Sequence, residues 1–444
     1  MEDADGFSVF QLYQKIFSGR RATVRARQHG WKVKPRIYSL RLLFWMMIFQ
    51  RLQAPGTLRQ AVQSLRRQKW ERLRPPPLSG GHRAVSVCTG GYCRARQRVP
   101  TGVVRELTSF LSTELQKYVA ESWPQQRPVY VFDGSSLQMQ AEAELKQLYP
   151  PGRNQHGRAH WPVMRIVVLH DARTALALPP AWAPMFGPQA VSEQVLAAPL
   201  IDQTPPEAIL LGDRNFGIFF IAYEAYRRQR HMILRLTKAQ AECLGGRDLL
   251  PRREQKLVWR PSPWDRRHHP ELPEDAQVSG RLLVLPVRGG REPIYLFTNL
   301  EATAEHVLEL YGLRWNIESD LRSLKRTVQL HRLASKSKEM IDKEIWAAVA
   351  AYNLVRAVIV LAARQAHLDP RQLSFSAVLY LVNDALPDLL ACSPHKARRE
   401  LRRLIDLATT CTLPRRRHPR SYPRAVWRPG FRYPAKSEPT GASK

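Results

Sequence analysis

Five short apolar runs between residues 128 and 237 constrain the fold of this chain more than any other feature. They read PVYVFD, MRIVVLHD, TALALPP, EAILLGD and HMILRLT, and each is flanked by turn-forming residues. Branched aliphatic runs of this length between turns predict strands. VSEQVLAAPLI, with Ser192 as its N-cap, and FGIFFIAYEAYRRQ predict helices before and after the fourth strand. Three strands, a helix, and then alternating strand and helix predict an α/β domain.

Asp133 ends the run PVYVFD and Asp213 ends the run EAILLGD. A side chain at the carboxyl end of a strand emerges at the edge where α/β sheets usually build their sites. The two aspartates would face each other if their strands are neighbours in the sheet. Aspartate is also a common turn residue after a strand, so for either one alone this simpler interpretation stays open.

A third acid lies in the stretch YGLRWNIESDLRSLK, residues 311–325. It predicts one helix because it has no proline and its apolar residues recur at three- and four-residue steps. At about 100° per residue one strip of that helix collects a carboxylate, three cations and a phenol. These residues are Tyr311, Arg314, Glu318, Arg322 and Lys325. The alternative is a solvated helix face with ordinary ion pairs.

The spacing of the acids predicts an insertion. Glu318 follows Asp213 by 105 residues, although one helix, one strand and short loops need only about 40. Residues 238–300 have alternating, β-branched character with Pro and Gly turns, so we expect a mainly β subdomain there. Because the preceding elements have the order of the ribonuclease H-like fold, the predicted class is α/β, a ribonuclease H-like core interrupted by a mainly β insertion, with helical N- and C-terminal regions. The Pro-rich sequence TALALPPAWAPM leaves the register of the third strand open.

These patterns divide the chain into six expected parts. They are residues 1–125 for a helical, basic DNA-binding region; 126–237 for the first part of the core; 238–300 for the insertion; 301–365 for the glutamate helix and the helix after it; 366–413 for a helical C-terminal region; and 414–444 for a flexible basic tail. In the first part, three helices and a Pro/Gly-rich link that ends in YCRARQR are expected.

The charge of the chain points to a polyanionic partner. Lys and Arg number 69 against 38 Asp and Glu, for a net charge of +31. The cations are spread along the chain and do not cluster beside an apolar anchor, which favours nucleic acid over a membrane surface. Five scattered cysteines and a start without a secretion signal predict a reducing compartment. The apolar run 345–363 is interrupted by Asn353 and Arg356, which favours a core helix over a membrane span.

Three carboxylates that converge on one sheet edge repel each other unless a cation lies between them. Oxygen ligands suit Mg²⁺ or Mn²⁺. Two such ions roughly 3.5–4 Å apart would support phosphodiester cleavage and strand transfer. Tyr311, Arg314 and Lys325 would then hold the phosphates.

At these residues the chain resembles a known family. The spacing Tyr-x2-Arg-x3-Glu-x6-Lys is similar to the signature of bacterial insertion-sequence transposases of the DDE superfamily, in particular the insertion sequence 4 family. FDGSS around Asp133 and GDRNFG around Asp213 resemble that family's two aspartate motifs, and YCRARQR resembles an arginine motif that precedes them. The resemblance covers about residues 85–365.

The resemblance implies a metal-dependent DNA transposase that nicks element ends, often passes through a DNA hairpin, and inserts the excised DNA into a target. Asp133, Asp213 and Glu318 would bind two Mg²⁺ or Mn²⁺ ions, while Tyr311, Arg314, Arg322 and Lys325 would contact DNA. Trp315 matches an aromatic residue of some relatives and would stack on an unpaired base or pack in the core. An aromatic residue of the insertion is expected to act with it, and Trp259 and Trp264 are both candidates.

The implied partners are double-stranded DNA, both the terminal inverted repeats and the target, and a second copy of the chain in a synaptic homodimer. The C-terminal helices within 366–413 are the expected dimer contact. No membrane partner is expected, and the implied location is the cytoplasm of a bacterium, at the nucleoid. Two other functions stay open: a catalytically silent DNA-binding derivative, and a metal-dependent nuclease on the same fold.

Overall fold

The computed structural model describes most of the chain from residue 20 to residue 414. The described residues are 13, 16, 20–31, 37–53, 56–67, 73, 84–122, 127–154, 157–247, 249–251, 253–286, 293–327, 330–331 and 333–414. The chain divides into two units, Met1–Thr412 and Leu413–Lys444. Apart from Pro414, the predicted basic tail lies outside the described residues.

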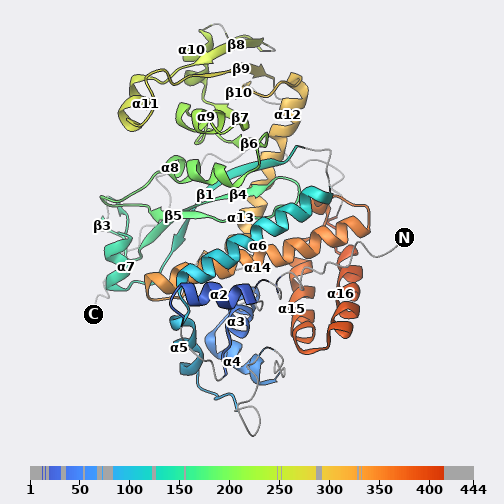
Figure 1. Ribbon diagram of the computed structural model, residues 1–444. Coiled ribbons are helices and arrows are strands. Elements are labelled where there is room, and N and C mark those ends of the chain that lie inside the picture. Colours follow the sequence, from blue (N-terminus) through green and yellow to red (C-terminus); the bar gives the residue numbers. More distant parts are fainter. Residues whose placement is uncertain are drawn as a thin grey trace, which may run out of the picture. The chain divides into compact units, whose positions relative to one another are not determined.

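One eight-stranded sheet organises the first unit, in the order β5-β4-β1-β6-β7-β10-β9-β8 (Figure 1). β1 pairs in parallel with β6, β6 pairs in parallel with β7, and all the other neighbours are antiparallel. The strands are β1 Val129–Gln138, β4 Val163–Asp171, β5 Ala181–Pro184, β6 Ile209–Gly212, β7 His231–Leu236, β8 Arg253–Trp259, β9 Val278–Leu285 and β10 Ile294–Thr298. A two-stranded sheet joins β2 Arg153–Asn154 to β3 Gly157–Arg158. The predicted α/β class is confirmed.

The third strand differs from the expected one. Residues 174–180 make only an isolated bridge, between Ala177 and His170, and regular pairing with β4 begins at Ala181. Pro179 and Pro180 lack the N–H groups that a ladder needs, so the strand forms after them. β5 lies at the edge of the sheet, where the proline at its end is tolerated.

Residues 238–300 contain three strands, but these strands do not form a sheet of their own. β10 pairs with β7, and β9 and β8 follow, so they extend the edge of the core sheet. Two helices also lie in this segment, α10 Lys238–Gly245 and α11 Pro263–His268. The apolar pattern of a strand does not show which strand it will pair with, and for this reason the extension was not predicted.

Helices cover both faces of the sheet. On one face α8 Glu193–Ala197 and α9 Phe219–Tyr226 pack on strand residues such as Tyr130 and Phe132. On the other face lie α12 Ala304–Gly312, α13 Ile317–Arg322 and the 28-residue helix α14 Lys338–Gln365, which runs beside α6 Thr101–Ser122 (Figure 1). The remaining described helices are α2 Arg20–Gln28, α3 Leu40–Leu52, α4 Leu58–Arg67, α5 Gly90–Arg98, α7 Ala143–Leu148, α15 Phe375–Ala391 and α16 Pro394–Thr409.

The two polar residues that interrupt the apolar run of α14 both have partners. The Asn353 side chain accepts a hydrogen bond from the Ala177 N–H at 2.9 Å and donates one to the Ala177 carbonyl at 2.8 Å. Arg356 pairs with Asp320. Among the described helices α14 is the one long and apolar enough to cross a membrane, and 94% of its most apolar window is buried.

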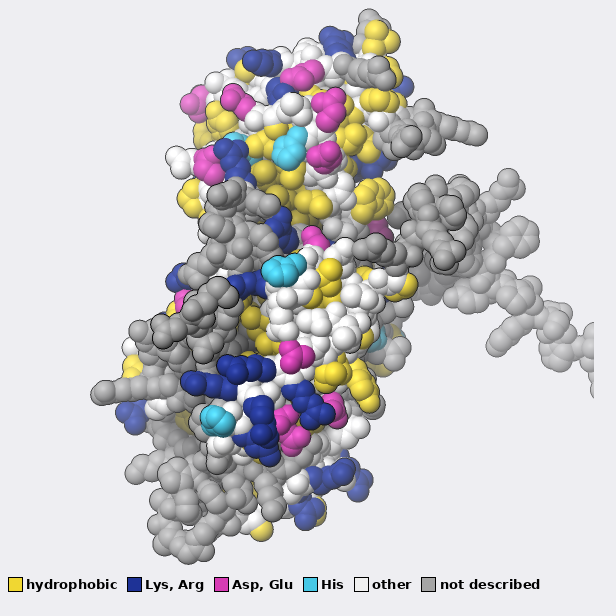
Figure 2. All heavy atoms as spheres, turned by 90° about the vertical axis from the view of Figure 1, so that its right-hand side faces the viewer, with side chains coloured by type: hydrophobic (Ala, Val, Ile, Leu, Met, Phe, Trp, Pro, Cys, Tyr) yellow, Lys and Arg dark blue, Asp and Glu magenta, His cyan; other side chains and the backbone are white. Residues whose placement is uncertain are grey.

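The N-terminal and C-terminal regions are helical, as predicted. The prediction that YCRARQR ends a Pro/Gly-rich link was wrong, because this sequence is part of helix α5. α16 carries exposed cations, among them Lys396, Arg399 and Arg403, with Glu400 between them and Asp406 after the last of them. On the face that Figure 2 shows, Lys and Arg side chains gather over the lower half with acidic side chains among them.

Candidate active site

The strand register brings Asp133 and Asp213 to the same edge of the sheet. β1 continues to Gln138 along β4, so the expectation that this strand ends at Asp133 was wrong. Its parallel pairing with β6 nevertheless stops where Val131 meets Leu211. Asp133 and Asp213 each lie two residues beyond this last pair. Because side chains alternate along a strand, both point to the face of Val131 and Leu211, which α12 and α13 cover.

The environment of Asp133 disfavours its charged form. Burial raises the pKa of Asp133 to about 7, and the negative charges of Asp213 and Glu193 act in the same direction. The Gly134 N–H, which donates to Asp133 Oδ1 at 2.8 Å, and the Arg314 guanidinium oppose this shift in pKa. A carboxylate pair that repels in this way is stabilised by a cation placed between its oxygens.

Glu193, the first residue of α8, is the third acid whose charge acts on the aspartates. The Ser192 hydroxyl caps this helix by accepting from the Val195 N–H at 3.2 Å, as predicted. The Glu193 carboxylate lies so close to Gly134 that a Cβ there would be 2.3 Å from its carboxyl carbon. It also accepts a hydrogen bond from the Asn215 side chain. Burial raises the pKa of Glu193, and Arg165, 3.8 Å away, opposes this.

The stretch 311–325 is helical throughout, but it is not one regular α-helix. α12 ends at Gly312, residues 313–316 form a 3₁₀ turn, α13 spans Ile317–Arg322, and residues 323–327 form a π-helical turn. The predicted single strip of polar residues is therefore wrong. Changes of helical winding such as the π turn often occur at functional sites.

Tyr311 and Arg314 lie inside the protein, which contradicts the solvated-face interpretation for these two residues. Their exposed fractions are 2% and 9%. Burial raises the pKa of Tyr311, and the nearby charges of Arg314, Arg235 and Asp213 also act on it. The Arg235 side chain is close enough to the Tyr311 hydroxyl for hydrogen bonding to oppose the raised pKa, but among the described residues neither this hydroxyl nor Arg314 Nε has a hydrogen-bond partner of good geometry. Two buried polar groups thus lie beside the aspartates with hydrogen-bonding capacity left.

Lys325 and Arg322 lie in different surroundings. Lys325 Nζ donates a hydrogen bond to Ser135 Oγ at 2.7 Å, which places it beside β1, two residues beyond Asp133. Arg322 is exposed. α13 is also held from behind, because the buried Asp320 pairs with Arg356 at 3.0 Å and with Arg371 at 2.5 Å.

Glu318 is on the exposed side of α13. Across the residues that the structure describes, no group of three Asp, Glu, His or Cys side chains lies at the distances that would hold a metal ion. The three predicted acids are therefore not gathered at ligand distances. Asp133 and Asp213 lie together, and the neighbouring acid is Glu193.

The structure also separates the candidate aromatic residues. Trp315 is 53% exposed, with the Arg314 guanidinium 4.5 Å from its ring centroid, so the core-packing alternative is wrong for it. Trp259 is buried between Phe219 and Phe297. Trp264 is 51% exposed and stacks on His268. Of the two tryptophans in the 238–300 segment, Trp264 is the one that a ligand can reach.

Three residues near the aspartates were missed in the sequence. Glu193 begins a helix and does not follow a strand, so the signal that singled out the aspartates was absent. Arg235 lies within β7, where charge normally indicates a solvent-facing position. Asn215 lies in GDRNFG, and its N–H donates to Asp213 Oδ1 at 2.9 Å; an aspartate followed two residues later by such a donor is a turn pattern that could have been recognised.

Comparisons with known proteins identify the family of this chain. Residues 124–354 match the family described as Transposase DDE domain. The chain is 27% identical over 422 residues to the transposase InsG for insertion sequence element IS4 of Escherichia coli (strain K12), covering 90% of this chain and 88% of that protein. A solved piggyBac transposase synaptic complex with hairpin DNA has 9% identity and a TM-score of 0.43 over 90% of this chain and 86% of that one. The chain therefore belongs to the DDE transposases of the insertion sequence 4 family, DNA-cleaving enzymes that in general use divalent metal ions.

Proposed function

We propose that this transposase cuts and joins the ends of an insertion sequence by two-metal-ion chemistry, with Asp133, Asp213 and Glu318 as the metal-binding acids. The observation that carries the proposal is the position of Asp133 and Asp213 at one sheet edge, two residues beyond the last parallel pair. Tyr311 and Arg314, from the segment that also carries Glu318, lie against them. The same segment thus supplies the third acid and the groups that would face the DNA.

The residues at the sheet edge fit a divalent cation. Their donors are carboxylate oxygens, which Mg²⁺ and Mn²⁺ prefer. Burial raises the pKa of Asp133 most, and the negative charges of Asp213 and Glu193, which a cation would neutralise, raise it further. Asp133 and Asp213 would hold two ions, with Glu318 brought in from α13. When bound, the ions supply activation of a water or 3′-hydroxyl and stabilisation of the leaving oxygen.

The protein's own residues would position the DNA. The Tyr311 hydroxyl and Arg314 Nε are buried without good partners in the described part of the chain, so a phosphate oxygen beside the aspartates would satisfy both. Lys325 and Arg322 would hold neighbouring phosphates. Trp315 and Trp264, both about half exposed, would stack on unpaired bases. Such stacking suits a pathway that flips a base, including one through a DNA hairpin.

We further infer the roles of the other parts. The core is ribonuclease H-like, since its five strands have the spatial order 3-2-1-4-5, and residues 238–300 are an insertion that lengthens the sheet beyond the fifth strand. Residues 1–125 bind DNA. The enzyme acts as a synaptic homodimer through 366–413, where Tyr380 of α15 is 73% exposed. It works by cut-and-paste on DNA in the bacterial cytoplasm, at the nucleoid.

The test is metal-dependent nicking of a supercoiled plasmid that carries this reading frame with its flanking DNA. We expect cuts at the element ends with Mg²⁺ or Mn²⁺, and none with Glu318→Gln, while binding of the flanking DNA persists. Glu309→Gln, at an exposed glutamate of α12, is the matched control and should cut normally. Normal cutting by Glu318→Gln would remove Glu318 from the site.

Two other outcomes distinguish the alternatives. Cuts spread over the plasmid with no preference for the element ends would indicate a nuclease. Binding of the flanking DNA by the wild-type protein without cuts in any divalent metal would indicate a silent derivative.

A further inference from the structure

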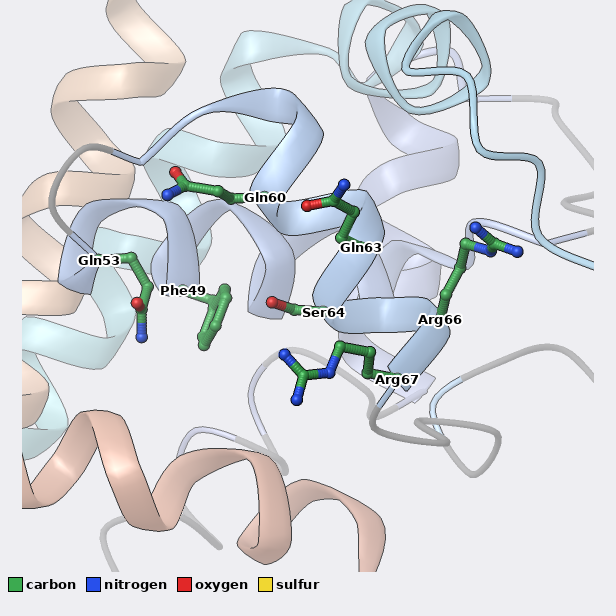
Figure 3. A pocket seen from close by; sticks show the side chains of 7 residues that line it. All are labelled: Phe49, Gln53, Gln60, Gln63, Ser64, Arg66 and Arg67. Atoms are coloured by element: carbon green, nitrogen blue, oxygen red, sulfur yellow. The ribbon is translucent and has the colours of Figure 1, made fainter.

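A polar groove lies between α3 and α4, far along the chain from the acidic residues. Its volume is about 570 Å³. Figure 3 shows Phe49 on α3, Gln53 directly after the end of α3, and the other lining side chains on α4. The lining residues are Phe49, Gln53, Gln60, Gln63, Ser64, Arg66 and Arg67. They include amides, a hydroxyl and two guanidiniums, and no acid.

The described residues at the end of α3 and just before α4 make specific contacts. A Cβ on Gly56 would lie 1.8 Å from the Gln50 carbonyl oxygen, so this close approach requires glycine. The Gln50 side chain donates to the Gly56 carbonyl at 3.0 Å and accepts from the Tyr92 hydroxyl at 2.7 Å. On the other side, Asn383 of α15 donates to the Leu52 carbonyl at 2.8 Å. These contacts hold the end of α3 and the residue Gly56, which precedes α4, in defined positions.

α4 presents one face to the protein and the other to solvent. Ala61, Val62 and Leu65 are buried and occupy about 100° of the helix circumference. The opposite side is centred on Gln63, with cations at its flanks. The exposed residues of this face are Arg59, Gln60, Gln63, Arg66 and Arg67. A helix whose outer face is made only of Gln and Arg has the side chains that read base edges and hold phosphates.

The charge around this helix is of one sign. Residues 6–70 contain 14 Lys and Arg and no Asp or Glu. Such a segment attracts a polyanion over its whole length. The α4 face has no exposed apolar side chain that would enter a lipid layer, so nucleic acid is favoured over a membrane.

We propose that α4 lies in the major groove of duplex DNA at the element's ends and reads its sequence through Gln63, while the groove beside it takes the phosphate backbone. This inference rests on the transposase function and names the part that selects the ends. α4 has 10 residues, and an α-helix with its side chains is about 10–12 Å across, which suits a major groove about 12 Å wide.

Gln63 is the main reader because Gln60 is partly engaged. The Gln60 carbonyl oxygen accepts from the Thr57 N–H at 3.0 Å and from the Thr57 hydroxyl at 3.1 Å, which caps α4. The Gln63 amide is exposed at the centre of the face and can bind adenine through both its oxygen and its nitrogen. Arg67, one turn further along, and Ser64 border the groove and would contact the phosphates.

The test is selection of binding sites by the full-length protein, in EDTA, from a pool of random 30-base-pair duplexes. We expect wild type to enrich one sequence motif. Gln63→Ala should bind the selected duplex about 10-fold more weakly and lose preference at one or two adjacent base pairs. Arg67→Ala should weaken binding to all duplexes and reduce the salt slope by about 1. Gln147→Ala, at an exposed glutamine of helix α7, should behave as wild type.

Three results would overturn the inference. They are no enriched motif with wild type, an unchanged motif and affinity with Gln63→Ala, or equal binding of the selected sequence as a single strand or as RNA. Unaltered melting of Gln63→Ala by circular dichroism shows that the variant is folded. Since selection needs no metal and no cutting, normal nicking together with an unchanged Gln63→Ala motif would reject this inference and leave the transposase function intact.

Discussion

Lys325 Nζ donates a hydrogen bond to Ser135 Oγ at 2.7 Å, across 190 residues of sequence. The bond ties the π-helical turn after α13 to β1, two residues beyond Asp133. The chain around Glu318 is thus attached to the strand of the first aspartate at one end and, through Asp320, to Arg356 and Arg371 behind it. These contacts fix the segment on either side of Glu318 without fixing Glu318 itself among the aspartates.

Lys325→Ala and Ser135→Ala distinguish a phosphate contact from a packing role. If Lys325 neutralises a DNA phosphate, Lys325→Ala should weaken binding of end DNA and reduce the slope of log K against log salt by about 0.9. Ser135→Ala removes the same hydrogen bond without removing a charge, so its slope should match wild type. Binding titrations at several salt concentrations measure both. Equal slopes for all three proteins would assign Lys325 to structure alone.

Glu193→Gln should weaken metal binding without unfolding the protein. Its carboxylate lies over Gly134 and its charge acts on both aspartates, so removing that charge lowers the negative potential that attracts a cation. A decrease in Mn²⁺ affinity of about 10-fold is expected, in the range found when residues around a metal site are changed. Calorimetric titration with Mn²⁺ measures it. Glu305→Gln, in the first turn of α12, is the control, and an equal affinity for both variants would exclude Glu193 from the site.

Replacement of Trp264 should impair base stacking on DNA, whereas replacement of Trp259 should lower the stability of the fold. Trp259→Ala removes a buried ring between Phe219 and Phe297 and should cost about 3–5 kcal/mol of unfolding free energy. Trp264→Ala removes an exposed ring and should change stability by about 0.5 kcal/mol or less. With 2-aminopurine placed near the cut in end DNA, quenching on binding should disappear in Trp264→Ala. Persistent quenching would indicate that another aromatic residue stacks there.

The sequence predicted those features of the fold and the site that are determined by residues close together in the chain. Four of the five core strands could be read from their runs of apolar residues, and the third could not. Asp133 and Asp213 lie at one edge because each follows the last parallel pair of β1 and β6 by two residues. The Ser192 cap was also predicted, since capping involves residues three apart.

The features of the site that the sequence did not predict depend on contacts between residues far apart in the chain. The polarity of Tyr311 and Arg314 suggests exposed side chains, but both are buried because their segment packs against the sheet. Helical periodicity does not distinguish an α-helix from the 3₁₀ and π turns in residues 313–327. Glu193 comes close to Gly134 only after α8 packs on β4, and no short motif records that contact.

His170, on β4 behind the active site, makes the fold sensitive to acid. It is fully buried, and neither ring nitrogen has a hydrogen-bond partner among the described residues. It faces the edge of Tyr352 with ring centroids 5.8 Å apart. Burial lowers the pKa of His170 to about 4; the charges of Arg356 and Arg371 act in the same direction, and that of Asp320 opposes them.

Since the pKa of an unfolded histidine is about 6.5, the unfolded chain binds the extra proton first. The stability that neutral His170 contributes is therefore fully present above pH 6.5 and is lost as the pH falls toward 4, by an amount on the order of 3 kcal/mol. Carboxylates titrate in the same window, so the informative quantity is the difference between wild type and His170→Leu, which has no group to protonate there. Urea unfolding at pH 7.5, 6.0 and 5.0 should show wild type losing stability faster than the variant. Parallel losses would show that His170 is already accommodated as a cation in the folded protein.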